Sequence, residues 1–324
     1  MREISFSEAT LEAMSEEMER DSSVFVLGED IARQVVIFGQ FKGLPQKFGT
    51  DRVLDTPISE TAIVGAAVGA ALAGMRPVAD MHFADFIGVC MDEVFNQMAK
   101  VRYMFGGQCK VPMVLRAPDG IIRSAAAQHS QSVEAWFMHI PGLKVVIPSN
   151  PADAKGLLKA AIRSDDPVLY FEHKVLFPMK GPVPDGDHIV PIGKANVSRK
   201  GKDVTIVSYS LMMHRALEAA EKLAAEGIEA EVIDLRTISP IDKDTIFESL
   251  RKTKRLVIVH EAVKQGGVGA EISALVAEEM IDWLDAPIRR IGAPFVPVPF
   301  SPPLEQLVKI SADHIAKTVK EICR

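Results

Sequence analysis

One carboxylate in this sequence is placed where a functional acid or base would be expected. Glu60 begins the run of small apolar residues at 60–74, ETAIVGAAVGAALAG, and Pro57 and Ile58 come just before it. Small side chains let another group approach the backbone closely, and a carboxyl group in apolar surroundings must find a partner or change its proton affinity. A Glu in a first helical turn also complements the helix dipole, so these residues alone leave a structural role open.

Two histidines and an aromatic residue extend this candidate site. His82 and Phe86 follow the strand-like segment at 76–80, and His129 follows the strand-like segment at 111–115. In open parallel sheets, ligands bind beyond the carboxyl ends of the strands, so we expect these side chains to approach the carboxylate there. Carboxyl and imidazole groups suit proton transfer. Packing at the edge of the core and a position in a surface loop are the structural alternatives.

Composition excludes several classes of protein. The chain has 324 residues, of which 48% are hydrophobic, and a net charge of −6 without a basic run, which argues against binding to nucleic acid or to anionic membranes. Three cysteines without C-x-x-C spacing fit free thiols in a reducing compartment. The charged N-terminal segment does not resemble a signal peptide, and the weakly polar run at 62–75 is shorter than the ~20 residues of a membrane helix. We therefore expect a soluble cytoplasmic protein.

Nucleotide and metal motifs do not account for the site. No Walker sequence, H-E-x-x-H or G-x-S-x-G occurs in the chain. The segment QGGVGAEI at 265–272 follows a strand-like segment and opens a helix, as a dinucleotide-binding turn does, but it lacks the third glycine and a later acidic residue. We interpret it as a structural turn, and a nicotinamide-dependent oxidoreductase would rest on this segment alone.

Helix-like and strand-like segments alternate along the chain, which predicts parallel sheets covered by helices. Asn150 and Pro151 have the residue types of a helix cap and a first helical position. Prolines and glycines gather at 174–193, and a second alternating series follows them. The sequence therefore predicts an α/β protein with two parallel-sheet domains, at 1–184 and 185–324.

Several longer motifs occur in order over essentially the whole chain: LGEDIA, RVLDTPISE, VGAAVGAALAGMRPVA, AAQHSQS, IPGLKVVIPS, DLRTISPID and PVPFSP. With these motifs the sequence resembles the beta subunit of the thiamine diphosphate-dependent component of 2-oxo acid dehydrogenase complexes, a group that includes acetoin dehydrogenase. The resemblance implies a pyrimidine-binding thiamine diphosphate domain followed by a domain like the carboxyl-terminal domain of transketolase.

The resemblance also implies a division of labour between two kinds of subunit. In the family, two alpha and two beta subunits form a heterotetramer, and alpha supplies the G-D-G…N motif that holds Mg²⁺ and the cofactor diphosphate. The segments PDG at 118–120 and DGDH at 185–188 do not match that motif. Beta supplies the pocket for the aminopyrimidine ring, and its second domain contributes to assembly and to docking on the acyltransferase core. The small-residue helix at 62–74 suggests beta–beta association.

Individual roles follow from positions that match the family motifs. Glu60 matches the carboxylate that hydrogen-bonds a pyrimidine ring nitrogen, and an apolar pocket would raise its proton affinity. Ile58 matches an apolar residue close to the ring, His82 a polar residue beside it, and Phe86 an aromatic residue stacking near it. His129 matches a loop histidine that faces the reacting centre, for proton transfer to the substrate or to the lipoyl acceptor.

The resemblance further suggests a potassium site. Some relatives bind K⁺ in beta through carbonyl groups that correspond to Met113, Ala161 and Ile162, together with an acidic residue. Ser164 stands here where that Asp would be, although Asp165 and Asp166 follow it.

The preferred hypothesis is an enzyme subunit that cleaves acetoin or a 2-oxo acid and transfers the two-carbon or acyl unit to lipoamide. Two segments, at 86–108 and 211–237, favour acetoin, whereas HEAVKQGGVGAEI at 260–272 is closer to the pyruvate and branched-chain versions. A pyruvate or branched-chain 2-oxo acid dehydrogenase beta subunit is the alternative. A non-catalytic assembly subunit with the same fold is the alternative from another class.

Overall fold

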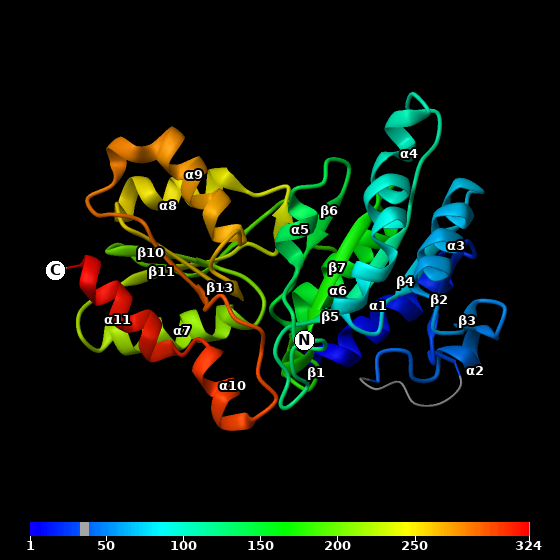
Figure 1. The fold of residues 1–324 in the computed structure, drawn as a ribbon, viewed down its shortest axis with the longest axis horizontal. Coiled ribbons are helices and arrows are strands. Elements are labelled where there is room, and N and C mark those ends of the chain that lie inside the picture. Colours follow the sequence, from blue (N-terminus) through cyan, green and yellow to red (C-terminus); the bar gives the residue numbers. More distant parts are fainter. Residues whose placement is uncertain (33–38, 324) are drawn as a thin grey trace. The chain divides into compact units, whose positions relative to one another are not determined.

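The computed structural model describes residues 1–32 and 39–323. The chain divides into two compact units (Figure 1). The first unit contains Met1–Asp119 and Trp136–Ile192, and the second contains Gly120–Ala135 and Gly193–Arg324. The chain therefore leaves the first unit at residue 120, runs through the second unit and returns at residue 136. A single boundary at 184/185 does not anticipate this excursion, and the division into domains at that boundary stays a prediction.

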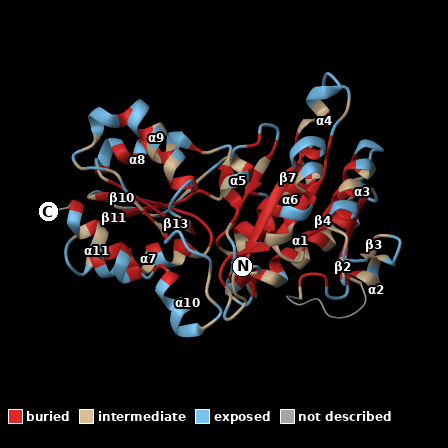
Figure 2. Ribbon diagram, viewed as in Figure 1, coloured by how far each residue is buried: buried red, intermediate tan, exposed pale blue. Residues whose placement is uncertain are grey.

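A parallel sheet forms the centre of the first unit. Its strands are hydrogen-bonded in the order β6-β7-β5-β4-β2-β3, and each neighbouring pair is parallel. Most of their residues are buried, as expected for strands covered on both faces (Figure 2). The strands are β2 (Val24–Glu29), β3 (Val53–Thr56), β4 (Arg76–Asp80), β5 (Val114–Asp119), β6 (Lys144–Val146) and β7 (Val168–His173).

Helices connect these strands, and β1 (Arg2–Ser5) pairs antiparallel with β8 (Lys180–Val183). The sequence pattern at 86–105 predicts one helix, whereas the structure forms a 3₁₀ helix, a π-helical turn and a short α-helix between residues 84 and 104. The helical segments are α1 (Phe6–Arg20), α2 (Leu44–Phe48), α3 (Glu60–Leu72), η1 (Ala84–Cys90), η2 (Glu93–Met98), α4 (Ala99–Met104), α5 (Glu134–Met138), α6 (Pro151–Arg163) and η3 (Lys174–Leu176).

Local signals explain where two of the long helices begin. Ser5 caps α1 in a capping box with Glu8, so that each side chain satisfies a backbone N–H of the other. The Asn150 side chain accepts a hydrogen bond from the Asp153 N–H, and Pro151 occupies the first turn of α6. The cap and proline predicted for this helix are confirmed.

The second unit is built around a sheet of order β14-β13-β10-β11-β9, in which β9 is antiparallel to β11 and the other pairs are parallel. Its core includes Ile206, Val232, Val257 and Ile315, all fully buried. The elements are β9 (Asn196–Arg199), β10 (Val204–Ser208), α7 (Leu211–Ala224), β11 (Ala230–Asp234), β12 (Thr237–Ser239), α8 (Lys243–Thr253), β13 (Leu256–Val263), α9 (Val268–Met280), η4 (Ile281–Trp283), β14 (Arg289–Ala293), α10 (Pro302–Val308) and α11 (Ala312–Ile322).

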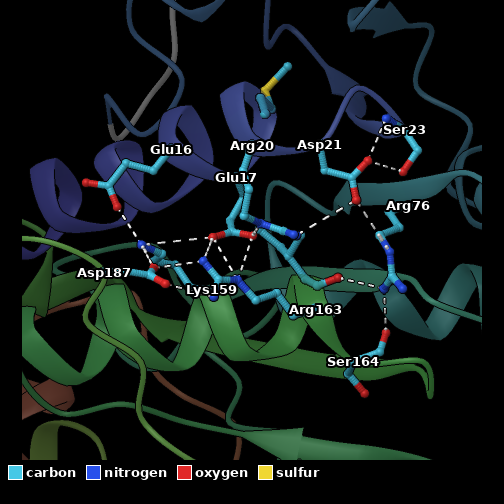
Figure 3. Close-up of polar contacts among 12 residues, drawn as sticks. Glu16, Glu17, Arg20, Asp21, Ser23, Arg76, Lys159, Arg163, Ser164 and Asp187 are labelled. Atoms are coloured by element: carbon cyan, nitrogen blue, oxygen red, sulfur yellow. Dashed lines mark hydrogen bonds and ion pairs between the residues drawn. The ribbon is translucent and has the colours of Figure 1, made fainter.

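A network of charged side chains joins α1 to α6 in the first unit (Figure 3). Glu17 on α1 is fully buried, and its carboxylate accepts hydrogen bonds from Arg20 at 2.7 Å and from Arg163 at 2.6 Å. Asp187 lies 2.6 Å from Lys159 and 2.7 Å from Arg163, and these two cations hold the pKa of Asp187 well below its usual range. The network therefore ties both helices and the segment after β8 together.

Replacing Glu17 by Ala should destabilise the protein by about 2 kcal/mol, because a buried network would lose its central acceptor. This cost is less than the roughly 3–5 kcal/mol lost when one partner of a fully buried ion pair is removed, because Arg163 is partly exposed and keeps its ion pair with Asp187. Glu19→Ala is the matched control on the same helix, because Glu19 is exposed and pairs with Lys47; its effect should stay below about 1 kcal/mol. Urea unfolding measures both variants, and equal effects would contradict the assignment.

Candidate functional site

Glu60 lies where the sequence predicts, at the first position of α3. The strand β3 ends at Thr56, Ser59 precedes the helix as its N-cap, and Glu60 is half-buried. The apolar residue Ile58 is 74% exposed, so the connection after β3 presents an apolar side chain at the surface directly before the carboxylate. The buried Thr56 hydroxyl has no hydrogen-bond partner among the described residues.

The start of α3 packs against the segment that carries Phe86. The Thr61 hydroxyl donates a hydrogen bond of 3.2 Å to the carbonyl oxygen of Val89, at the end of η1. Cys90 is fully buried, and its pKa is raised to about 12, first by loss of solvation and then by the nearby carboxylates of Glu93 and Glu60. The thiol is therefore a neutral core group, and the Glu60 carboxylate lies close enough to act on it electrostatically.

His82 and Phe86 belong to one cluster of rings after β4. The ring centroids of His82 and Phe83 are 5.4 Å apart, and those of Phe83 and Phe86 are 5.9 Å apart, both in edge-to-face geometry. The Lys174 ammonium lies 5.4 Å from the centroid of Phe83. The first unit thus brings together a polar ring, aromatic faces and a cation beyond the carboxyl ends of β4 and β7.

Glu60 and this ring cluster share one edge of the sheet. Both β3 and β4 run parallel to β2, and Glu60 follows β3 as His82 follows β4. Parallel neighbours end at the same edge, which is the usual position of ligand sites in such sheets. The strand directions are consistent with the prediction that Glu60, His82 and Phe86 meet at this edge, and direct contact among the three side chains stays a prediction.

His129 lies in the second unit, within the segment at 120–135. That segment is anchored by its backbone, because the Ile121 N–H donates to Glu261 at 2.5 Å and the Ser124 N–H donates to Glu305 at 2.8 Å. His129 itself is half-buried. Its approach to the reacting centre stays a prediction.

Three buried charged residues near the ring cluster escaped the sequence analysis. Asp80 ends β4, Arg116 lies in β5 and Glu172 lies in β7, and all three side chains are buried. Burial raises the pKa of Asp80 to about 6, against the lowering effect of the Arg116 charge. The available signal was a charged residue inside an otherwise apolar strand run, which rarely occurs unless the charge is paired.

The carbonyl groups predicted to bind potassium accept hydrogen bonds from protein donors. The Met113 oxygen accepts from the Val168 N–H at 3.0 Å, and the Ala161 oxygen accepts from the Ser164 N–H at 3.1 Å. The Ile162 oxygen and the Ser164 oxygen each lie 3.1 Å from Nη1 of Arg76. A guanidinium nitrogen thus bridges two carbonyls, as a bound cation would.

The carboxylates beside these carbonyls are also paired with protein cations. Asp165 contacts Arg76 at 2.8 Å and Lys110 at 2.6 Å, while Asp166 pairs with Arg102 and Lys144. Potassium at Ile162 would have to displace or share the Arg76 guanidinium, so this arrangement does not fit an ion bridging the Ile162 and Ser164 oxygens. Among residues 1–32 and 39–323, no group of three or more His, Cys, Asp or Glu side chains is placed to hold a metal.

The glycines of QGGVGAEI have a packing explanation in the second unit. A Cβ atom on Gly267, the N-cap of α9, would lie 2.5 Å from the His260 ring, and one on Gly269 would lie 3.0 Å from it. His260 is fully buried, and burial lowers its pKa to about 4. The small residues therefore make room for a neutral imidazole, which supports the interpretation of this segment as a structural turn.

The fold and the site define a class of protein. Residues 2–180 match the family described as transketolase, pyrimidine binding domain, and residues 193–315 match transketolase, C-terminal domain. A solved structure described as a split gene transketolase, inactive beta4 tetramer, is similar with a TM-score of 0.78 and 26% identity, over 99% of this chain and 98% of that chain. The protein is therefore a transketolase-like, two-domain α/β protein.

Similarity to individual relatives defines a family within the transketolase-like proteins. The chain is 52% identical to the beta subunit of acetoin:2,6-dichlorophenolindophenol oxidoreductase from Cupriavidus necator, over 99% of this chain and 97% of the relative. It is 47% identical to the 2-oxoisovalerate dehydrogenase beta subunit of Bacillus subtilis, over 99% of both chains, and 46% identical to a mitochondrial pyruvate dehydrogenase E1 beta subunit of Oryza sativa, over 99% of this chain and 87% of the relative. The chain belongs to this family of acetoin and 2-oxo acid dehydrogenase beta subunits.

The helices formed by the described residues are too short or too polar to cross a membrane. None of them combines the length and the apolar character that a membrane span requires.

The Arg76 geometry predicts that thermal stability does not depend on potassium. A site with a Kd near 1 mM would add about 2.7 kcal/mol at 100 mM K⁺, whereas a guanidinium that already bridges the carbonyls leaves little to gain. The midpoint of thermal unfolding should therefore agree within about 1 °C in 100 mM KCl and 100 mM NaCl, whereas a gain of about 2.7 kcal/mol would raise the midpoint by about 4 °C in a protein of this length. A clear rise in KCl alone would support an ion at Met113, Ala161 and Ile162 instead.

Proposed function

We propose that this chain is the beta subunit of a thiamine diphosphate-dependent enzyme that cleaves a carbon–carbon bond next to a carbonyl group and passes the product unit to a lipoyl acceptor. The observation that carries the proposal is the position of Glu60. This half-buried carboxylate begins α3, the helix that packs against the segment carrying Phe86, in the part of the chain that matches a pyrimidine-binding domain. The pairing of a carboxylate with aromatic faces suits an aminopyrimidine, which offers ring nitrogens and a flat apolar surface.

In this proposal each of the four candidate site residues in the first unit has a distinct task. Glu60 hydrogen-bonds a pyrimidine ring nitrogen and shares a proton with it, Phe86 stacks near the ring, Ile58 contacts its apolar face and His82 offers a polar edge. When bound, thiamine diphosphate supplies an electron sink for the carbanion formed as the substrate bond breaks. The residues present fit the pyrimidine end of that cofactor, since they provide one acid, aromatic surface and a buried hydroxyl at Thr56 without a partner among the described residues.

The diphosphate end requires another chain in this proposal. An alpha subunit would hold it with Mg²⁺, because the family motif G-D-G…N that binds the metal and the diphosphate has no match in the segments PDG at 118–120 and DGDH at 185–188. The similar solved transketolase is an inactive tetramer of beta chains, which is consistent with a beta chain that needs alpha. We therefore propose an α2β2 heterotetramer with beta–beta contact, which docks on an acyltransferase core through the second unit.

His129 has a proposed role in proton transfer to the substrate or to the lipoyl group. An imidazole suits this step because its two ring nitrogens can accept and donate a proton. The segment that carries it is fixed by the backbone contacts of Ile121 and Ser124, which would limit its movement. The residue acts only when the substrate and both subunits are assembled.

Replacing Glu60 by Gln in the complex with alpha should lower kcat by about 10²–10⁴-fold, the usual contribution of a general acid or base. The amide keeps the size and a hydrogen-bonding oxygen but cannot exchange a proton. Glu3→Gln, an exposed residue of β1, is the control and should leave kcat unchanged. Steady-state kinetics with saturating thiamine diphosphate and Mg²⁺ give kcat for both variants. Unchanged turnover by the Glu60 variant would favour a non-catalytic assembly subunit.

Among substrates we propose acetoin. Two acetoin-type beta subunits are 52% and 50% identical to this chain, compared with 47% for the 2-oxoisovalerate and 46% for the pyruvate relative. The margin is narrow, and the alpha subunit shares the pocket, so a pyruvate or branched-chain 2-oxo acid is the second candidate.

The reconstituted complex should turn over acetoin with a higher kcat/KM than pyruvate or 3-methyl-2-oxobutanoate. Acetoin carries a neutral hydroxyethyl group where the 2-oxo acids carry a carboxylate, and a charge that finds no partner in a pocket is costly to bury, so the difference in kcat/KM should exceed about tenfold. Lipoamide-linked turnover measured with each substrate at several concentrations gives the comparison. Turnover of a 2-oxo acid with no activity toward acetoin would replace the acetoin proposal by the second candidate.

A further inference from the structure

A buried cluster of three charged side chains links neighbouring strands of the first unit. Nε of Arg116 donates to Oε2 of Glu172 at 2.8 Å, and Nη2 donates to Oε1 at 2.7 Å, so the pair is bidentate. Both side chains are 0% exposed. Asp80 lies directly opposite Arg116 in the register between β4 and β5, so both side chains lie on the same face of the sheet.

Stability alone does not explain this cluster. Two carboxylates and one guanidinium are removed from water, and such groups often contribute less than apolar residues of the same volume. One nitrogen of Arg116, Nη1, and one oxygen of Asp80, Oδ2, have no hydrogen-bond partner among the described residues. The Arg116 guanidinium also lies 5.0 Å from the ring centroid of Phe41. Buried atoms without a partner among the described residues call for an explanation beyond the contribution of the cluster to folding.

The second carboxylate oxygen of Asp80 shapes the backbone after β4. Oδ1 accepts a hydrogen bond of 3.0 Å from the His82 N–H, which closes an Asx-type turn. His82 has a φ of +58°, a left-handed conformation that costs a residue with a Cβ atom roughly 1 kcal/mol or more. The Asp80 hydrogen bond therefore stabilises the strained residue that begins the ring cluster.

The surrounding strands hold Asp80 in place for this purpose. Gly28 of β2 lies opposite Asp80, and a Cβ atom at Gly28 would lie 3.0 Å from both Cβ and the carbonyl oxygen of Asp80. Arg116 attracts the carboxylate from the other neighbouring strand. The carboxylate is thus confined between a glycine on one side and an oriented guanidinium on the other.

We propose that Asp80, oriented by the Arg116–Glu172 pair, is a positioning residue that holds His82 and the Phe83–Phe86 rings in the geometry of the cofactor site. The proposal has two parts, and the second part, the effect of Asp80 on cofactor binding, rests on the proposed function. The first part, control of the His82 backbone, concerns this chain alone.

Two substitutions of Asp80 separate its hydrogen bond from its charge. Asp80→Asn keeps an oxygen that accepts the His82 N–H, whereas Asp80→Ala removes it; both leave Arg116 paired with Glu172, so the fold should survive. In the α–β complex without cofactor, amide hydrogen exchange at His82 should accelerate about tenfold in Asp80→Ala and stay within about threefold of wild type in Asp80→Asn. Urea unfolding of the same samples identifies any general loss of stability.

Cofactor binding tests the second part. Titration with thiamine diphosphate in the presence of Mg²⁺, followed by intrinsic fluorescence, should give a Kd about tenfold higher for Asp80→Ala, with near-normal binding restored in Asp80→Asn. Glu3→Gln again serves as the exposed control and should bind as wild type does.

The outcomes distinguish this inference from the proposed function. Unchanged exchange at His82 in Asp80→Ala would overturn the positioning role, and so would equal damage by Asn and Ala, since the charge and not the hydrogen bond would then matter. Faster exchange with unchanged cofactor affinity would overturn the link between His82 and the site. None of these results bears on the Glu60→Gln test, so loss of the positioning role leaves the proposed function standing.

Discussion

The site depends on the register of parallel strands that are buried on both faces. Gly28 of β2 lies opposite Asp55 of β3 on one side and opposite Asp80 of β4 on the other, and Asp80 lies opposite Arg116 of β5. A slip of one residue would move every side chain of a strand to the other face, which would separate Asp80 from the guanidinium and leave a buried carboxylate without its cation. The apolar core thereby fixes the polar edge: packing of residues such as Val26 and Val78 determines where Glu60 and His82 emerge.

The segment between the two predicted domains shows how polar contacts decide the limits of a compact unit. Its proline and glycine content is typical of a linker, yet Val190 packs on α6 so closely that a Cβ atom at Gly156 would lie 2.6 Å from the valine side chain. Asp187 forms ion pairs with Lys159 and Arg163 on the same helix (Figure 3). Residues up to Ile192 therefore belong by their contacts to the first unit. Composition predicts a linker at 174–193, but it does not show that this segment contains η3 and β8 or on which surface it packs.

The sequence predicted the features that depend on local pattern. The strand–helix alternation indicated the parallel sheets, Asn150 indicated the start of α6, and the small-residue run indicated α3 with Glu60 in its first turn. Features that depend on contacts between distant residues were not predicted. The pairing of Arg116 with Glu172 requires knowledge of which strands are neighbours, and the contact of Arg76 with the Ile162 carbonyl requires knowledge of which helix packs beside β4. The 3₁₀ and π turns at 84–104 were not predicted either. A charged residue in an apolar strand signals that a partner exists but does not identify it.

The exposure of the apolar residues around Glu60 explains why a site of this kind would be divided between subunits. Ile58 is 74% exposed, and on α3 the small residues Ala62, Ala66 and Gly69 are not buried by this chain alone. While Ile58 and these small residues of α3 are exposed, water still reaches the Glu60 carboxylate, so the local dielectric constant around that carboxylate stays high. The apolar surroundings suggested by the sequence would therefore be completed only when a ring and a second chain cover this face. A carboxylate that gains its environment through assembly would have its full catalytic effect in the complex and little in the separate chain, which also limits side reactions before the acceptor is in place.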